Sequence, residues 1–277
     1  MRSVLCMGLS PTLSLTCEKQ IRALAAVGFD GFFTAFDEKT AVYRALADEL
    51  GMLYQSIHAP IDYVAAMWRG GEMAEKGVRA LTACAEACAQ NGIPTMVAHT
   101  YMGFEKNGGP TAIGIENYRR VVERAADLGV KVALENTEGE EYLATLMRAL
   151  ADYDNLGFCL DTGHEFCYNK GQDMLALYGD RLLATHINDN LGVSSPDGVI
   201  SPKDDLHLLP FDGRVDMLSA AQRLVKCGYK GPLTFEIKRN RIEGRRENDG
   251  YFAMSPEAFL NEAHGRALRF CALVDGK

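Results

Sequence analysis

Short apolar runs alternate with longer segments of helical period along almost the whole chain. The short runs are rich in β-branched and aromatic residues, which predicts strands; the longer segments repeat apolar residues at three and four positions, which predicts amphipathic helices. The predicted strands cover residues 4–9, 31–36, 53–58, 95–100, 131–135, 156–161, 183–188 and 232–237. The predicted helices cover residues 11–27, 40–50, 73–91, 113–128, 141–151, 172–179, 215–227 and 256–274.

Five of the predicted helices end beside a glycine, and a predicted strand follows within a few residues. Glycine adopts the left-handed conformation that closes a helix, so these glycines mark helix ends. Eight strands in alternation with eight helices predict a single (β/α)8 TIM barrel over residues 1–277, in preference to a doubly wound open sheet. The five glycines are Gly28, Gly51, Gly92, Gly129 and Gly228.

Composition narrows the class of protein. A length of 277 residues suits one barrel domain, and an apolar fraction of 47% excludes disorder. No run approaches the roughly 20 apolar residues that span a membrane, and the N-terminus lacks a secretory signal, so we expect no membrane partner. Eight cysteines without a CxxC pair are typical of a reduced, cytoplasmic protein. The net charge of −8 argues against a nucleic-acid partner.

Five of the six histidines stand at or just after the end of a predicted strand, together with four acidic residues. Parallel strands end at the same mouth of a barrel, where barrel enzymes build their sites. A carboxylate there is costly to bury unless it is paired in a salt bridge or bound to a cation, and imidazole with carboxylate suits a divalent metal. The pattern predicts a catalytic metal centre. The nine residues are His58, His99, His164, His186, His207, Glu135, Asp161, Asp205 and Glu236.

Seven motifs occur in the order in which one known superfamily carries them. SIHAP, VAHT, ALENTEG, CLDTGH, THINDN, DLHLLPFDGRVD and LTFEIK resemble the xylose isomerase-like barrel superfamily, from the third to the eighth predicted strand. The superfamily includes sugar-phosphate isomerases and epimerases, ketose 3-epimerases, inosose-processing enzymes and the endonuclease IV group. The resemblance implies a principal divalent metal (Mn²⁺, Zn²⁺, Co²⁺ or Mg²⁺). Its implied ligands are Glu135, Asp161, His186 and Glu236.

The resemblance also implies a reaction. In similar epimerases the counterparts of Glu135 and Glu236 exchange a proton next to the carbonyl of the substrate, through an enediolate. The expected function is therefore a metal-dependent isomerase or epimerase that acts on a sugar, an inosose or a sugar phosphate. We expect Glu135 and Glu236 to be its acid and base.

The same resemblance leaves a second function open. His58, His99, Asp205 and His207 are similar to the extra ligands with which the endonucleases assemble a three-zinc cluster, and His164 is a candidate for a substrate hydroxyl or a second metal. A zinc-dependent, endonuclease IV-like phosphodiesterase is therefore the alternative, and a non-catalytic barrel that keeps a metal site is a third. The Pro-x-x-Gly segment after His207 resembles the isomerase-like members more closely.

The loops at the same mouth hold further candidates. Lys238, two positions after Glu236, is a candidate electrophile or salt-bridge partner. Lys238, Arg239 and Arg241 lie in a basic segment that is a candidate phosphate site or a solvated loop. Trp68 is a candidate lid over a sugar, with a core or subunit-contact role as the alternative, and homo-oligomerisation is one expectation that this residue raises.

Overall fold

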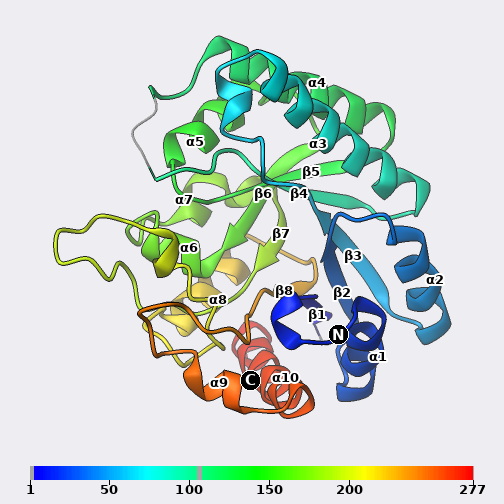
Figure 1. Ribbon diagram of the computed structural model, residues 1–277, viewed down its shortest axis with the longest axis vertical. Helices are drawn as coiled ribbons and strands as arrows, with labels where there is room; N and C mark the ends of the chain where they lie inside the picture. Colours follow the sequence, from blue (N-terminus) through cyan, green and yellow to red (C-terminus); the bar gives the residue numbers. More distant parts are fainter. Residues whose placement is uncertain (1–2, 105–107, 277) are drawn as a thin grey trace.

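All eight predicted strands are present, and they form one parallel sheet that closes almost completely into a barrel (Figure 1). The computed structural model describes residues 3–104 and 108–276. Neighbouring strands follow chain order from the first to the seventh, the eighth pairs with the first, and a bridge between Ile187 and Phe235 links the two remaining edges. The strands are β1 (Leu5–Gly8), β2 (Gly31–Ala35), β3 (Leu53–His58), β4 (Thr95–His99), β5 (Lys131–Glu135), β6 (Leu156–Asp161), β7 (Leu182–His186) and β8 (Leu233–Phe235).

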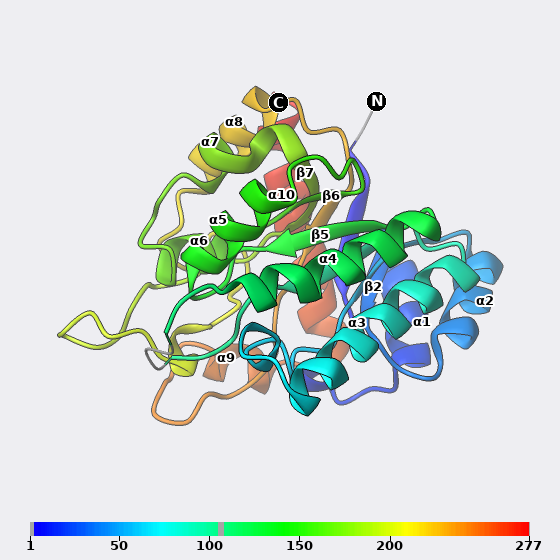
Figure 2. The same cartoon turned by 90° about the horizontal axis from the view of Figure 1, so that it is seen from above.

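Helices follow the strands and cover the outside of the barrel (Figures 1 and 2). The long ones were all predicted, whereas α6 and α9, six and five residues long, were not, because so short a segment shows little periodicity. The α-helices are α1 (Cys17–Val27), α2 (Thr40–Leu50), α3 (Glu72–Gln90), α4 (Ala112–Asp127), α5 (Glu140–Ala149), α6 (Thr162–Cys167), α7 (Met174–Tyr178), α8 (Met217–Lys226), α9 (Asp249–Ala253) and α10 (Pro256–Val274). The 3₁₀ turns are η1 (Pro11–Leu13), η2 (Ala66–Trp68), η3 (Gly179–Arg181) and η4 (Pro202–Asp204).

The predicted helix over residues 11–27 is divided in two. Ser14 has a φ of 58°, in the left-handed region, which ends the 3₁₀ turn η1. Thr16 then caps α1 by accepting a hydrogen bond from the backbone N–H of Lys19. Apolar spacing alone did not register this break, because Leu13 and Ile21 are both buried in the core that the two elements share.

Two apolar regions hold the fold together. The larger one lies between the sheet and the surrounding helices, and burial of its aliphatic and aromatic side chains is the main stabilising term. The smaller one fills the interior of the barrel with Val97, Ala133, Cys159 and Ala184, one from each of four neighbouring strands. The second region is the floor on which the candidate site stands.

The long loops gather on one side of the barrel. Because all strands are parallel, the segments after β3, β7 and β8 leave the sheet at the same face, and Figure 2 shows η2, the loop after β7 and α9 on one side of the molecule. Among the residues described, no helix combines the length and the apolar character needed to cross a bilayer. The loop-bearing face is where the predicted site residues lie.

Candidate metal centre

Four neighbouring strands carry the same two-step pattern inside the barrel. Side chains alternate between the two faces of a strand, so residues two positions apart point the same way. On β4 to β7 a small apolar residue is followed, two positions later, by a residue that can bind a metal, and hydrogen-bond register sets these residues side by side. The four potential ligands are His99, Glu135, Asp161 and His186.

Glu135 lies at the centre of this layer and is fully buried. Its Oε1 is 3.2 Å from Nδ1 of His186 and 3.4 Å from Nδ1 of His164. Its Oε2 is 3.3 Å from Nε2 of His58 and 3.5 Å from Nε2 of His99. Within the described part of the chain, neither oxygen accepts a hydrogen bond of good geometry. A buried carboxylate in this state is costly, and a cation shared with the imidazoles would satisfy it.

Among the described residues, four groups of side chains have ligand atoms within 4.8 Å of one another. One of them consists of Glu135, Cys159 and His186, and the other three together hold the nine residues predicted from the sequence. The first ligand group consists of His58, His99 and Glu135. The second ligand group consists of Glu135, Asp161, His186 and Glu236. The third ligand group consists of His164, Asp205 and His207. Since Glu135 belongs to the first two groups, its carboxylate is placed to bridge two ions. The structure thus brings together all nine residues that the sequence selected for metal binding.

Backbone carbonyls orient three of the histidines. Nδ1 of His58 lies 2.9 Å from the carbonyl oxygen of Ala59, Nδ1 of His164 lies 3.0 Å from that of Asn136, and Nδ1 of His207 lies 2.9 Å from that of Glu236. Donation of the Nδ1 proton to these oxygens leaves Nε2 with a lone pair facing a carboxylate. Metal-binding histidines are commonly held in this way, so the donor set fits a divalent metal.

Opposite charges and burial compete at the site. Burial alone would raise the pKa of Glu135, but the imidazoles of His186, His164 and His58 hold it well below its usual range. Burial would likewise lower the pKa of His164, but the carboxylates of Asp161 and Asp205 raise it well above its usual value. The opposite charges of imidazoles and carboxylates thus counteract the effect of burial on the pKa values of Glu135 and His164.

Asp161 is held by the chain on either side of it. Burial, opposed by His164 and reinforced by Glu135, raises the pKa of Asp161 to about 6. Nδ2 of Asn188 donates to its Oδ2 at 2.7 Å, and the backbone N–H of His164 donates to its Oδ1 at 2.7 Å, which starts α6. A Cβ at Gly163 would collide with Oδ1 of Asn188, so this turn requires glycine. The CLDTGH motif thus orients the side chains of Asp161 and His164 towards the same position in the site.

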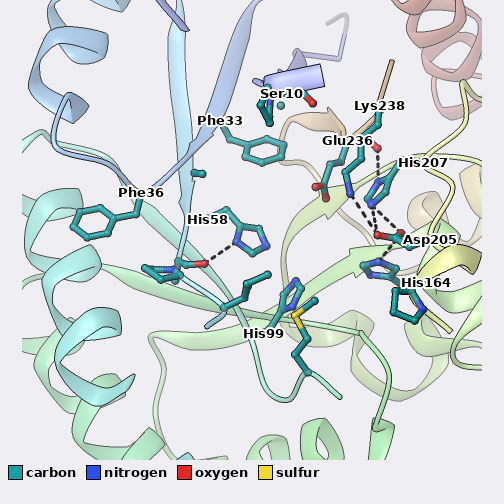
Figure 3. A pocket seen from close by; sticks show the side chains of 18 of the residues that line it. Ser10, Phe33, Phe36, His58, His99, His164, Asp205, His207, Glu236 and Lys238 are labelled. Carbon is teal, nitrogen blue, oxygen red and sulfur yellow. Dashed lines mark hydrogen bonds and ion pairs between the residues drawn. The ribbon is translucent and has the colours of Figure 1, made fainter. Parts of the chain in front are cut away.

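A cavity of about 560 Å³ opens above the ligands (Figure 3). Six members of the ligand groups line one side of the cavity, whereas Glu135 is buried below it. The six are Glu236, Asp205, His58, His99, His164 and His207. Apolar side chains make up much of the remaining lining, and the ring of Phe33 stacks on His186 with a centroid separation of 4.6 Å. The apolar lining residues include Leu9, Phe33, Phe36, Ile61, Met102 and Phe104. A small molecule that enters would therefore contact both polar and apolar side chains.

Two neighbours of the centre were missed in the sequence. Glu138 lines the cavity, accepts a hydrogen bond from the backbone N–H of Gly103 at 2.7 Å, and has its pKa raised by burial. Cys159 has its thiol near Glu135 and His186, in the floor. Glu138 follows the end of β5 by three residues, a position that the strand-end pattern gave no reason to select, and Cys159 was interpreted as an ordinary buried thiol.

Several candidates from the sequence lie outside the cavity. Trp68 is buried in the core and donates its indole N–H to the carbonyl of Thr100 at 2.7 Å, so the core interpretation holds and the lid interpretation does not. Arg239 donates to the carbonyls of Phe252 and Met254, and therefore fixes the loop after β8 instead of facing a phosphate. Arg241 points to the surface, where it pairs with Asp249.

Asp189, in the THINDN motif, is neither solvated nor a metal ligand. It is buried, and it accepts hydrogen bonds of 2.9 Å from the backbone N–H groups of Phe211, Gly213 and Val215. These bonds fold the loop after β7 back on the barrel, and this loop supplies Asp205 and His207. Asp189 therefore supports the third ligand group from a distance.

Among curated proteins, the chain is 30% identical over 212 residues to y4fM, an uncharacterised protein of Sinorhizobium fredii. The aligned segment covers 72% of this chain and 62% of y4fM. The chain is also 30% identical over 142 residues to a probable endonuclease 4 of Cenarchaeum symbiosum, and this aligned segment covers 43% of this chain and 49% of that protein. The chain thus spans less than two thirds of the length of each.

Solved structures show the same fold. The IolI protein, described with a bound zinc atom, superposes with a TM-score of 0.76 at 18% identity and covers 98% of both chains. The D-allulose 3-epimerase of a Methylomonas species, described in complex with D-allulose, has a TM-score of 0.70 at 18% identity and covers 96% of both chains. The family model of the xylose isomerase-like TIM barrel matches residues 21–259. The chain therefore belongs to the xylose isomerase-like TIM barrel family.

Proposed function

We propose that this protein is a divalent-metal-dependent isomerase or epimerase that transfers a proton next to the carbonyl of a sugar, an inosose or a sugar phosphate. The observation that carries the proposal is the second ligand group. Oε2 of Glu236 and Oε1 of Glu135 lie 2.9 and 3.2 Å from Nδ1 of the same imidazole, that of His186, and Glu236 opens into the cavity. Two carboxylates from separate strands thus meet at one potential metal position beneath a substrate-sized space.

The buried and the partly exposed residues of the second ligand group have different proposed roles. Glu135, Asp161 and His186 are completely buried and would hold the ion, with the amide of Asn188 fixing Asp161. A bound divalent ion would supply the Lewis acidity that makes a proton beside a carbonyl removable. Glu236 has an exposed fraction of 20% and is placed to take up and return that proton. The apolar side chains of the cavity, among them Phe33, would limit the access of water to the reacting carbon.

The different burial of the two glutamates bears on the type of reaction. Epimerisation requires a proton-transfer group on each face of the carbon, whereas aldose–ketose isomerisation can use one face. Because Glu236 lines the cavity and Glu135 lies below it, the arrangement favours exchange on one face, with Glu135 acting chiefly as a ligand. Isomerisation is therefore the preferred member of the pair.

Solvent deuterium exchange tests this proposal. The metal-loaded protein is incubated in D₂O with ketoses, inososes and their phosphates, and deuterium incorporation is measured by mass spectrometry. We expect Glu236→Gln to lower the incorporation rate about 10²–10⁴-fold, with the metal content of each variant determined in parallel. Glu243→Gln, which changes an exposed carboxylate after β8, is the matched control and should exchange at the normal rate. Undiminished exchange in Glu236→Gln would remove Glu236 from the proton transfer.

A second candidate function is supported by the completeness of the ligand set. Three ligand groups around one carboxylate could hold several zinc ions, and clusters of metals catalyse phosphodiester hydrolysis. The similarity to a probable endonuclease 4 points in the same direction. Cleavage of a duplex that contains an abasic site, by the zinc-loaded protein, would favour this function. We place it second because the net charge is −8 and Arg239 and Arg241 are engaged with the loop after β8.

We also propose that the protein works in the cytoplasm. The support is that all eight cysteines are free, six of them buried. Reduced thiols of this kind are typical of cytosolic proteins.

A further inference from the structure

We propose that the ammonium group of Lys238 takes the place of a cation at the third ligand group, so that the metal centre holds at most two divalent ions. The inference rests on the metal centre that the proposed function requires, but not on the reaction. Lys238 is not one of the nine potential ligands, but its ammonium group pairs with one of them, Asp205.

The carboxylate of Asp205 is the common partner of three nitrogen groups (Figure 3). Its Oδ1 lies 3.1 Å from Nε2 of His164 and 2.8 Å from Nε2 of His207. Its Oδ2 lies 2.9 Å from the same atom of His207 and 3.4 Å from Nζ of Lys238. Both oxygens are therefore already in contact with nitrogen groups, and one of these is an ammonium ion.

The backbone holds Lys238 in this position. Its N–H donates to the carbonyl oxygen of His207 at 3.0 Å, and Nδ1 of His207 lies 2.9 Å from the carbonyl oxygen of Glu236. The chain after β8 is thus tied to the segment that carries Asp205 and His207. His207 has a φ of 46°, a left-handed conformation that is strained for a residue with a Cβ and that such contacts must maintain. Lys238 stands beside Asp205 because of this pairing, and not through a free side-chain rotation alone.

The first and second ligand groups differ from the third in the kind of side chain that pairs with their carboxylates. The ion pairs of Glu135 and Asp161 among the described residues involve only histidines. A histidine can release its proton and become a ligand, whereas the ammonium group of lysine cannot bind a metal while it is charged. A divalent ion in the first or second group therefore replaces protons, but in the third group it would have to share Asp205 with a fixed positive charge.

The repulsion is large at this distance. A metal bound to Asp205 would lie about 2.0–2.2 Å from the carboxylate oxygen, and Nζ of Lys238 is 3.4 Å from Oδ2. Two cations, one of them divalent, would then lie a few ångströms apart. We expect this to weaken binding of a third ion by at least about 100-fold. Because Lys238 lines the cavity, its ammonium group is also available to a substrate oxygen, beside the ions of the other groups.

Metal counting tests the inference without reference to activity. The full-length, tag-free protein is stripped of metal, equilibrated at a series of buffered free Zn²⁺ concentrations, and analysed for bound zinc by elemental analysis. The unaltered chain should reach no more than two ions per chain. Lys238→Met and Lys238→Gln should gain a third ion, with an affinity at least about 100-fold higher than that of any third ion in the unaltered chain. Lys238→Arg, which keeps the charge, should not gain it, and Lys230→Met changes an exposed lysine as the control.

Each contrary result has a distinct meaning. Three tightly held ions in the unaltered chain would overturn the inference, as would a count that stays at two in both folded neutral variants. Circular dichroism establishes that the variants are folded, and two neutral replacements guard against one failure to fold. A chain that binds no zinc would overturn the metal centre as a whole. Absent deuterium exchange with a normal zinc count would reject the proposed reaction and leave the role of Lys238 intact.

Discussion

The most informative single residue is a buried glutamate, Glu135, whose oxygens lie near four imidazole nitrogens but accept no hydrogen bond of good geometry among the described residues. Glu135 could be selected from the sequence because it ends the apolar strand VALE, where a carboxylate needs a charged partner. What the sequence could not supply was the sharing of its two oxygens between separate pairs of imidazoles, because that depends on side-chain directions from four strands. Glu138 was not found for a related reason: its burial follows from the loop at Gly103.

At the same scale, Asn188 provides a test of how strongly the centre is preorganised. Asn188→Ala removes the donor to Oδ2 of Asp161, so we expect metal affinity to fall about 10–100-fold. Competition with a fluorescent chelator measures the affinity. Asn190→Ala, which removes a buried hydrogen bond to the carbonyl of Asp204, should lower the melting temperature and leave the metal affinity unchanged. Equal metal affinities in Asn188→Ala and the unaltered chain would contradict the role of Asn188.

At the scale of elements, the barrel could be predicted because its signals are local. Short runs rich in β-branched and aromatic residues placed every strand within a few residues, and glycine at helix ends separated the helices from the strands that follow. The misses are elements fixed by single contacts. The cap at Thr16 divides the first predicted helix, and the side chain of Asp161 starts α6. The sequence left Trp68 open between a lid and a core or subunit-contact role, and the structure places it in the core, where it packs on Tyr118 and Tyr142.

The turn from β6 into α6 can be tested with a pair of glycines. Gly163→Ala introduces a Cβ that collides with Asn188, so we expect a loss of about 1–3 kcal/mol in the free energy of unfolding. Gly265→Ala, inside α10 and with open space around it, should instead stabilise the protein by about 1 kcal/mol because alanine favours a helix. Denaturant unfolding measures both. A neutral Gly163→Ala would show that the turn tolerates a side chain.

At the scale of the whole molecule, a barrel stabilised from outside supports an interior that is rich in buried charge. The apolar region between the sheet and the helices is extensive, a small apolar layer lies inside the barrel, and the polar cluster lies at the loop-bearing end. Such a cluster lowers stability unless cations neutralise it. Protons do so in the metal-free protein, and a metal ion should do so in the loaded one.

The replacement of bound protons by metal ions predicts an unusual dependence of stability on pH. The pKa values of His164 and His186 are raised well above about 6.5 in the folded protein, so folding takes up protons and stability is lost as the pH rises through the raised values. Asp161, raised from 3.8 to about 6, contributes in the same direction as the pH rises to neutrality. We expect the metal-free protein to melt a few degrees lower at pH 8 than at pH 6.

Calorimetry with and without metal checks this dependence. Because Zn²⁺ or Mn²⁺ binds the deprotonated ligands, the loaded protein should lose the decline towards pH 8 or reverse it. A melting temperature of the metal-free protein that rises between pH 6 and pH 8 would contradict the assigned charges.

The most direct test of the metal centre is anomalous diffraction from crystals grown with Zn²⁺ and measured on both sides of the zinc edge. The arrangement of Glu135, Asp161, His186 and Glu236 predicts a strong peak within about 2.0–2.2 Å of one ligand atom from each. No peak is expected among His164, Asp205 and His207, where Lys238 supplies the positive charge. Zinc bound only at the outer surface, with none beside Glu135, would contradict the account.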